Sequence, residues 1–280
     1  MAYPTINGPY GLKPVNLIGG QFYGGGTRQL PIQYGYATTI GYGDLVKLVH
    51  GLVNRAAIST DGTGTEIIGV FLGCSYTSPT TKNKIFSQYW PASTLAGDAL
   101  AVIADDPDII YKVAVCSATT VIGSTSKAQV GKNMSLIDNA PSAVTGDSAI
   151  AGLAVVTGAD GLVTAACPLR IINVVHDTAI VNSVPYTSTS TVTITVPALT
   201  MALIAGSSVA TVAANGQLME TGAFTIADYA IGATAVVLNV DPGATLLPNS
   251  AGTLVITQYP EALVKINFGC HRYNVALAIA

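Results

Sequence analysis

The sequence predicts an all-β protein, a β-sandwich or barrel with an extended N-terminal arm and a second small β domain inserted near the C-terminus. Glutamate is almost absent, whereas Thr, Val, Ile, Gly and Tyr are plentiful, which removes helix propensity and favours strands. Short apolar runs recur at regular spacing between Gly, Pro, Asn and Asp turn signals. Such spacing is typical of sandwiches and barrels.

Seven apolar runs define the expected strands of a main domain that takes in residues 36–185 and 258–280. These runs are residues 45–49, 67–74, 85–89, 99–104, 109–115, 149–157 and 166–175. Between residues 124 and 137 the pattern is weak, and a loop and a short helix are both compatible with it.

Residues 1–35 differ from the rest of the chain. Glycine and proline interrupt any regular element there, as in Gly24-Gly25-Gly26, yet aromatic residues are frequent, unlike in a flexible linker. We therefore expect an extended arm that becomes ordered by lying either on its own domain or on a neighbouring molecule.

A second unit is predicted at residues 186–257. It begins with the Ser/Thr-rich stretch 187–190 and contains four apolar runs, at 209–212, 224–226, 235–240 and 253–257. The cluster Asp241-Pro242-Gly243 marks a turn, because proline fixes φ and glycine accepts positive φ. Residues 262–268 again resemble the earlier strands. The second unit is therefore expected to be an insertion, with the terminal strand returning to the main domain.

Charge excludes some partners and suggests others. Charged residues make up only 10% of the chain, against about 25% in a typical soluble domain, which favours burial against other subunits as a homo-oligomer. The net charge is −3 and the basic residues are scattered, so we expect no nucleic-acid partner.

The apolar run at 198–214 does not predict a membrane span. It contains glycine and hydroxyl residues, follows an alternating strand pattern, and has no Lys or Arg flank to fix a topology. The N-terminus lacks the features of a signal peptide. We therefore expect no membrane partner and synthesis in the cytoplasm.

Catalytic and metal-binding patterns are weak throughout. The four cysteines lie in or beside apolar runs without a CxxC pair, which predicts buried thiols, and the three histidines are too dispersed for zinc. Asp105-Asp106-Pro107-Asp108 lacks the glycine and distal glutamate of a calcium loop. No nucleophile motif such as GxSxG occurs. We expect no enzymatic activity, no metal and no cofactor.

One resemblance is carried by the N-terminal residues. Asn7-Gly8-Pro9-Tyr10-Gly11-Leu12-Lys13-Pro14-Val15, followed by Tyr23-Gly24-Gly25-Gly26-Thr27-Arg28, resembles the opening of structural proteins encoded beside the major capsid protein in tailed phages, especially marine ones. The similarity continues through 42–47, 69–74 and 104–108 and covers about the first 180 residues and the tail. The 186–257 unit departs from it. The resemblance implies a head decoration or cement protein on the outer capsid surface, often trimeric.

The leading hypothesis is therefore a structural virion protein that binds the major capsid protein from outside and cements or decorates junctions between its subunits. Six N-terminal residues are the candidate contacts: Tyr3, Tyr10, Phe22, Tyr23, Arg28 and Tyr34. An alternative is a receptor-binding or fibre-like adhesin that recognises host glycans through Trp90 or the 186–257 unit. A major shell subunit is a third possibility, but no segment has the period of a long spine helix.

Overall fold

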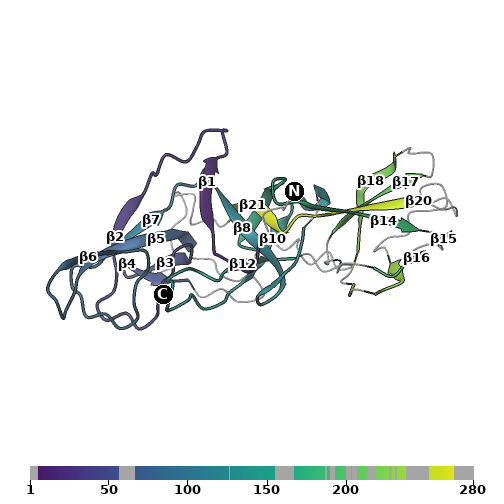
Figure 1. Ribbon diagram of the computed structural model, residues 1–280. Coiled ribbons are helices and arrows are strands. Elements are labelled where there is room, and N and C mark those ends of the chain that lie inside the picture. Colours follow the sequence, from purple (N-terminus) through teal and green to yellow (C-terminus); the bar gives the residue numbers. More distant parts are fainter. Residues whose placement is uncertain are drawn as a thin grey trace.

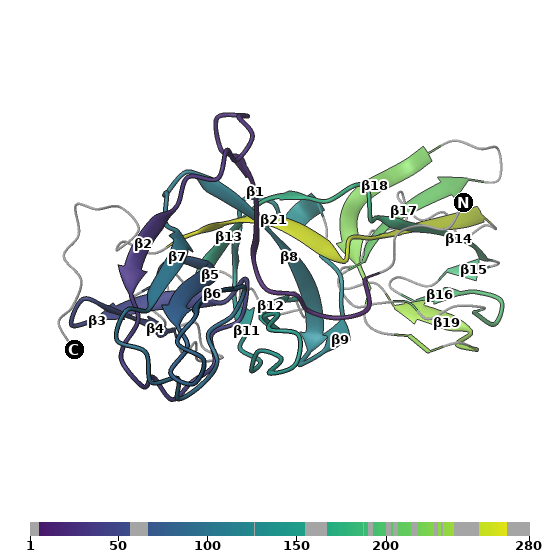
Figure 2. The same cartoon turned by 60° about the vertical axis from the view of Figure 1, so that its left-hand side comes forward.

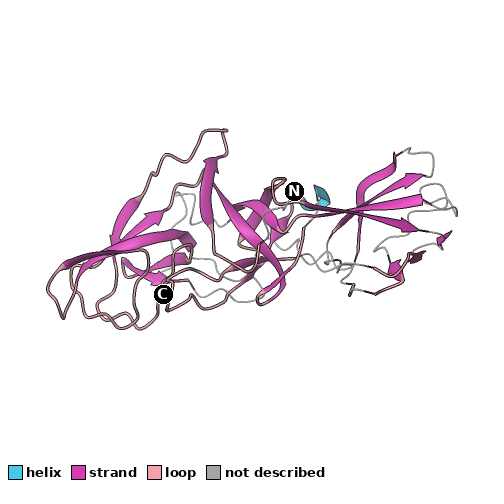
Figure 3. Ribbon diagram, viewed as in Figure 1, coloured by secondary structure: helices cyan, strands magenta, loops and turns pink. Residues whose placement is uncertain are grey.

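The protein is all-β, as predicted. The computed structural model describes residues 6–56, 67–125, 127–154, 167–186, 188–189, 193–199, 203, 207–213, 218–226, 229–230, 232–237 and 252–267. Strands dominate these residues, and their one helical element is the 3-10 helix η1 (Lys127–Gln129) (Figure 3). This helix and two short strands occupy the stretch around 124–137, where the sequence pattern was ambiguous.

The main domain contains an eight-stranded, nearly closed, barrel-like sheet. Six strands form its main path, in the order β10 (Asn133–Met134), β13 (Leu169–Val174), β21 (Glu261–Ile266), β8 (Ile109–Ala118), β12 (Ala151–Leu153) and β11 (Leu136–Ile137). Strands β1 (Lys13–Leu17) and β9 (Val121–Ile122) each pair with β8 outside this path. The long strand β8 therefore organises the sheet.

A six-stranded sheet packs beside it. Its main path is β2 (Arg28–Pro31), β7 (Leu100–Ala104), β5 (Ile67–Thr77), β3 (Leu45–Val49) and β4 (Leu52–Arg55), and β6 (Lys84–Ser87) also pairs with β5. Each of the seven apolar runs expected in the main domain overlaps a strand of one of the two sheets.

The six-stranded sheet buries both of its faces, which explains the continuous apolar sequence of β5. Val70 joins a core shared with the barrel-like sheet, where it packs with residues such as Tyr111 and Val264. Its neighbour Phe71 faces the other way, into a second core that contains Trp90. Alternate residues of one strand thus serve two cores.

The N-terminal segment, within its described part, lies along its own chain. β1 pairs antiparallel with β8, and β2 pairs antiparallel with β7. These strands lengthen both sheets of the main domain. Both strands within residues 6–35 thus pair with strands of this chain.

The remaining strands form a separate module at one end of the elongated molecule (Figure 1). One sheet has the order β14 (Ile180–Tyr186), β20 (Gly252–Gln258), β17 (Ser208–Ala213) and β18 (Leu218–Thr225). The other has the order β15 (Ser188–Thr189), β16 (Thr193–Thr195) and β19 (Ala235–Val237). Residues such as Tyr186, Ile194 and Ile256 form a core of its own. Two residues after β20, the chain re-enters the main domain as β21, between β13 and β8.

Candidate interaction surface

Tyr10 anchors the N-terminal segment to the main domain. Its hydroxyl donates a hydrogen bond to Oε1 of the buried Glu261. The Lys13 Nζ lies 4.6 Å from the centroid of the Tyr10 ring, and the Lys112 Nζ lies 3.2 Å from Glu261 Oε1. Burial raises the pKa of Tyr10 well above its usual value, and the hydrogen bond and negative charge of Glu261 raise it further. Tyr10 is therefore held as a neutral donor.

Glu261 lies where the chain passes between the main domain and the module. Its Oε2 accepts a hydrogen bond from the Thr178 hydroxyl at 3.0 Å, and its backbone carbonyl accepts one from the Val175 N–H at 3.1 Å. The Pro260 carbonyl accepts the N–H of Val115 at 2.8 Å. Through Glu261, Tyr10 thus connects the N-terminal segment to both stretches of chain that pass between the main domain and the module.

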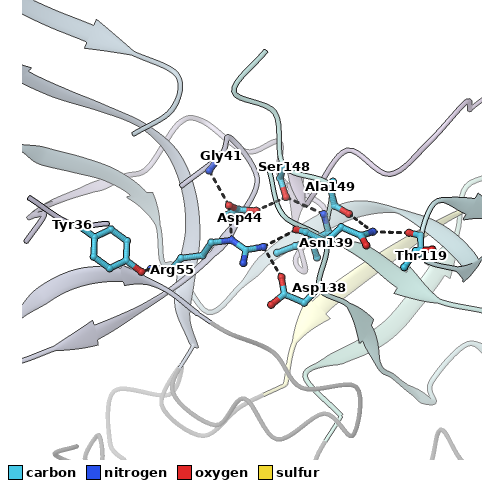
Figure 4. A network of polar contacts seen from close by, with 10 residues as sticks. Tyr36, Gly41, Asp44, Arg55, Thr119, Asp138, Asn139, Ser148 and Ala149 are labelled. Carbon is cyan, nitrogen blue, oxygen red and sulfur yellow. Dashed lines mark hydrogen bonds and ion pairs between the residues drawn. The ribbon is translucent and has the colours of Figure 1, made fainter. Parts of the chain in front are cut away.

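A second buried polar cluster lies next to the N-terminal segment (Figure 4). The Asp44 carboxylate accepts hydrogen bonds from the Gly41 N–H at 2.8 Å, Arg55 Nε at 2.9 Å and the Ser148 hydroxyl at 2.6 Å. Arg55 also pairs with Asp138. Burial raises the pKa of Asp44, and the Arg55 charge and the hydrogen bonds offset this only in part. These contacts join the β3–β4 hairpin to the 138–148 segment, which is a structural role.

Gly11 and Leu12 pack directly on this cluster. Gly11 has a φ of +77°, and a Cβ there would lie 2.5 Å from Ser148 Cβ. Leu12 is fully buried in the core between the two sheets, and its N–H donates to the Gly43 carbonyl at 3.0 Å. Residues 10–12 are therefore part of the folded body.

The chain between β1 and β2 has the opposite character, and it projects beyond the sheets in both views (Figures 1 and 2). Its turn is closed by a hydrogen bond from the Leu17 N–H to the Gln21 carbonyl at 2.8 Å. The Ile18 N–H donates to the Asp108 carbonyl at 2.9 Å, which ties the turn to the loop after β7. Backbone hydrogen bonds therefore hold this hairpin in place.

Two large apolar side chains are exposed on this hairpin. Phe22 is 87% exposed and Ile18 is 51% exposed, and residues 14–27 contain no charged side chain. We call Ile18 and Phe22 the hairpin tip. An aromatic side chain presented on a fixed backbone loses little conformational entropy when a partner covers it. The hairpin tip therefore has the properties of a protein-binding site.

The six candidate contact residues have different surroundings. Tyr23 packs against the core between the sheets, and its hydroxyl donates to the Gly26 carbonyl. Arg28 forms an ion pair of 2.6 Å with Asp105. Phe22, Tyr34 and Arg28 are exposed, Tyr34 by 63% and the Arg28 side chain by 45%, whereas Tyr10 is an internal anchor and Tyr3 lies outside the described residues.

Sequence reasoning missed several exposed apolar residues, among them Ile18, Phe86 and Leu95. Leu95 is more than half exposed, and the Gly35 N–H donates to the Thr94 carbonyl at 3.2 Å. This bond brings the Tyr34 loop beside the Leu95 loop. Ile18 could have been found from its position before Gly19-Gly20, a turn signal that places the preceding side chain at a hairpin end.

The tryptophan and cysteines that were considered for sugar binding, disulfides or metal binding are buried inside the fold where the structure describes them. Trp90 is fully buried, lies edge-on to Tyr76 at 5.4 Å and donates to the Tyr36 carbonyl at 3.4 Å, so its faces are not available to a sugar. Cys74 and Cys116 are buried free thiols and Cys167 is also buried, in line with the burial expected of the cysteines. Burial raises the pKa of Cys74 to about 12 and that of Cys116 to about 11. Cys270 lies outside the described residues.

Two searches of the described part of the chain had negative results. They found no group of three or more His, Cys, Asp or Glu side chains placed to hold a metal ion. No helix among the same residues has the length and apolar character needed to cross a membrane. Asp105 and Asp108 of the acidic turn are instead paired with Arg28 and Lys265.

Comparison with known proteins adds no relative to the resemblance noted in the sequence. No protein-family model, no curated protein and no solved structure matches this chain.

Proposed function

We propose that this protein is a structural virion protein that binds the outside of a tailed-phage capsid and cements or decorates junctions between major capsid subunits, as a homo-oligomer, by the resemblance a trimer. The observation that carries the proposal is the hairpin tip, Ile18 and Phe22. It lies in an uncharged loop, and Phe22 is almost fully exposed there. The N-terminal resemblance to proteins encoded beside the major capsid protein supports the same assignment.

The proposed mechanism is burial of the hairpin tip between capsid subunits. Phe22 and Ile18 enter a gap between two subunits, and Tyr34 with Leu95 provides a second apolar contact. The Tyr10–Glu261 contact and the buried Leu12 hold the segment on the decorating subunit. Separation of the capsid subunits then requires the loss of these contacts as well, which stabilises the shell.

The test uses heads of the phage that encodes the protein, stripped of it, and purified protein added back. Phe22→Ala removes the exposed ring. We expect the affinity for heads to fall by about 30-fold, because an aromatic at the centre of an interface contributes about 2 kcal/mol or more. Binding is measured by co-sedimentation, and shell stability by the temperature at which DNA is released.

Val144→Ala is the matched control, because Val144 is also an almost fully exposed apolar side chain, in a loop outside the hairpin. It should bind heads like the unchanged protein. Equal affinity of the two variants would overturn the role of the hairpin tip. Failure of the unchanged protein to bind heads would overturn the proposed function itself.

The alternative is a glycan-binding adhesin, which we place second because the tryptophan expected to stack on a sugar is buried. Its aromatic candidate, Trp90, lies in the core of the six-stranded sheet. Copy number per virion distinguishes the two functions, because a decoration protein is present in hundreds of copies and a fibre in a few.

A further inference from the structure

Strand β14 forms one edge of the four-stranded sheet in the module. Among the described strands it pairs only with β20, in a continuous antiparallel register from Ile180↔Gln258 to Tyr186↔Gly252. Edge strands present N–H and C=O groups that can pair with a further strand. The edge of β14 contains no charged residue to discourage this.

Pro185 shows which backbone groups of β14 face outward. Proline has no N–H, so within a sheet its nitrogen is placed on the side away from the neighbouring strand. Pro185 lies opposite Thr253 in the β14–β20 pair. Because backbone direction alternates along a strand, Val181 and Ser183 also turn their N–H and C=O groups away from β20. Two donors and three acceptors are thus directed outward.

A groove runs beside this edge. It has a volume of about 450 Å³ and is lined by residues 181–185 of β14 and by Pro197, Ala198 and Leu199. None of the lining residues is charged, and most are apolar. An extended, uncharged segment could therefore pair with β14 through its backbone and place alternate aliphatic side chains in the groove.

The C-terminal residues of the chain have this chemistry. Residues 274–280 read Asn-Val-Ala-Leu-Ala-Ile-Ala, an uncharged sequence in which Val275, Leu277 and Ile279 alternate with alanines. In an extended strand the three larger side chains share one face. The small alanines on the other face need no cover.

We propose that β14 is a strand-addition site that accepts residues 275–279 of a second copy of this chain. The added strand pairs with the outward groups of Val181 and Ser183, and its larger side chains fill the groove. Such a contact is heterologous, because different surfaces of the two copies meet, so repetition around an axis closes a ring. This inference goes beyond the proposed function and requires no capsid.

Photo-cross-linking of the full-length protein tests the contact. A benzophenone amino acid replaces Leu277, and the irradiated sample is separated by mass and digested. We expect a product of two or more chain masses in which position 277 is joined to residues 181–185 or 197–199. Cross-links confined to a single chain, or joined to other residues, would overturn the proposal.

Three substitutions test the geometry by light scattering. Ser183→Pro removes an outward N–H and should reduce association by at least tenfold, while circular dichroism confirms that the variant is folded. Leu277→Asp should have the same effect, whereas the matched control Ala278→Asp, on the opposite face, should associate normally. An unchanged oligomer in Ser183→Pro and Leu277→Asp, or a monomer at all concentrations of the original protein, refutes strand addition whatever the result with phage heads.

Discussion

The N-terminal segment contains two regions of similar composition and opposite behaviour. Residues 10–12 place Tyr10 on a buried glutamate and Leu12 in the core. A few residues further along, the hairpin of residues 13–27 leaves Ile18 and Phe22 in solvent. Both regions are rich in glycine and aromatic residues. The difference comes from what each region meets. The first lies on Glu261, Gly43 and Ser148, whereas the chain between β1 and β2 extends beyond the sheets (Figure 2).

This comparison separates two functions that aromatic residues serve in one segment. The inward residues stabilise the fold, and the outward residues are available for a partner. Substitutions should therefore affect the free energy of unfolding in the first region and binding in the second.

The largest effect is expected for Leu12→Ala. The substitution leaves a cavity in the core between the two sheets, and a buried Leu→Ala change costs about 2–5 kcal/mol. Ile18→Ala removes a similar side chain from the hairpin tip and should change stability by less than about 0.5 kcal/mol. Urea unfolding measures both, and similar losses would contradict the division between the two regions.

A pair of glycines sharpens the comparison. Gly11 and Gly20 have nearly equal positive φ values, +77° and +82°, so alanine at either costs about 1–2 kcal/mol in backbone strain. At Gly11 the new Cβ would also clash with Ser148, whereas at Gly20 it meets no atom within 4 Å. Gly11→Ala should therefore destabilise the protein by about 1–3 kcal/mol more than Gly20→Ala does. Equal midpoints in thermal unfolding would contradict the packing at Gly11.

Loss of the Tyr10 hydroxyl should lower the free energy of unfolding by less than the two preceding substitutions. Tyr10→Phe removes the donor to the buried Glu261 carboxylate but keeps the ring beside Lys13. Hydrogen bonds to charged groups contribute about 1.5–3 kcal/mol, so a loss in that range is expected. Tyr23→Phe removes an exposed hydrogen bond to Gly26 and should cost less than about 0.5 kcal/mol. A larger loss in Tyr23→Phe than in Tyr10→Phe would contradict the anchoring role of the Tyr10 hydroxyl.

The smallest change in stability is expected for Phe22→Ala. The ring contributes little to the fold because it is exposed, so the free energy of unfolding should remain within about 0.5 kcal/mol of the original value. Chemical unfolding followed by circular dichroism provides the measurement. A loss above 1 kcal/mol or so would show that Phe22 packs within the chain and would remove it as a contact residue.

Much of the fold could be predicted because local patterns determine it. The runs at 45–49 and 109–115 have the apolar character of buried strands, and β3 and β8 lie there. Strands β1 and β4 were not predicted, because Lys13-Pro14 and Asn54-Arg55 interrupt their apolar residues. Arg55 is accommodated in β4 because its charge meets Asp44 and Asp138.

The orientation of the N-terminal aromatic residues could not be predicted from the segment alone. Tyr10 and Phe22 both lie in stretches that contain several glycines. Tyr10 points inward because Glu261, which is 251 positions away in the chain, accepts its hydrogen bond. No local pattern contains that information, whereas the exposure of Phe22 follows from the lack of any such partner among the described residues.

The way in which the module is connected makes it exchangeable. Val174 and Ala262 are directly paired in β13 and β21, and the Val175 N–H donates to the Glu261 carbonyl. The excursion from 176 to 260 therefore starts and finishes at neighbouring points of one ladder, and Glu261 stays in the main domain. A tight two-residue turn could close that ladder as an ordinary hairpin. The module could therefore be deleted, or replaced by another domain, without a change in the strand order of the main domain.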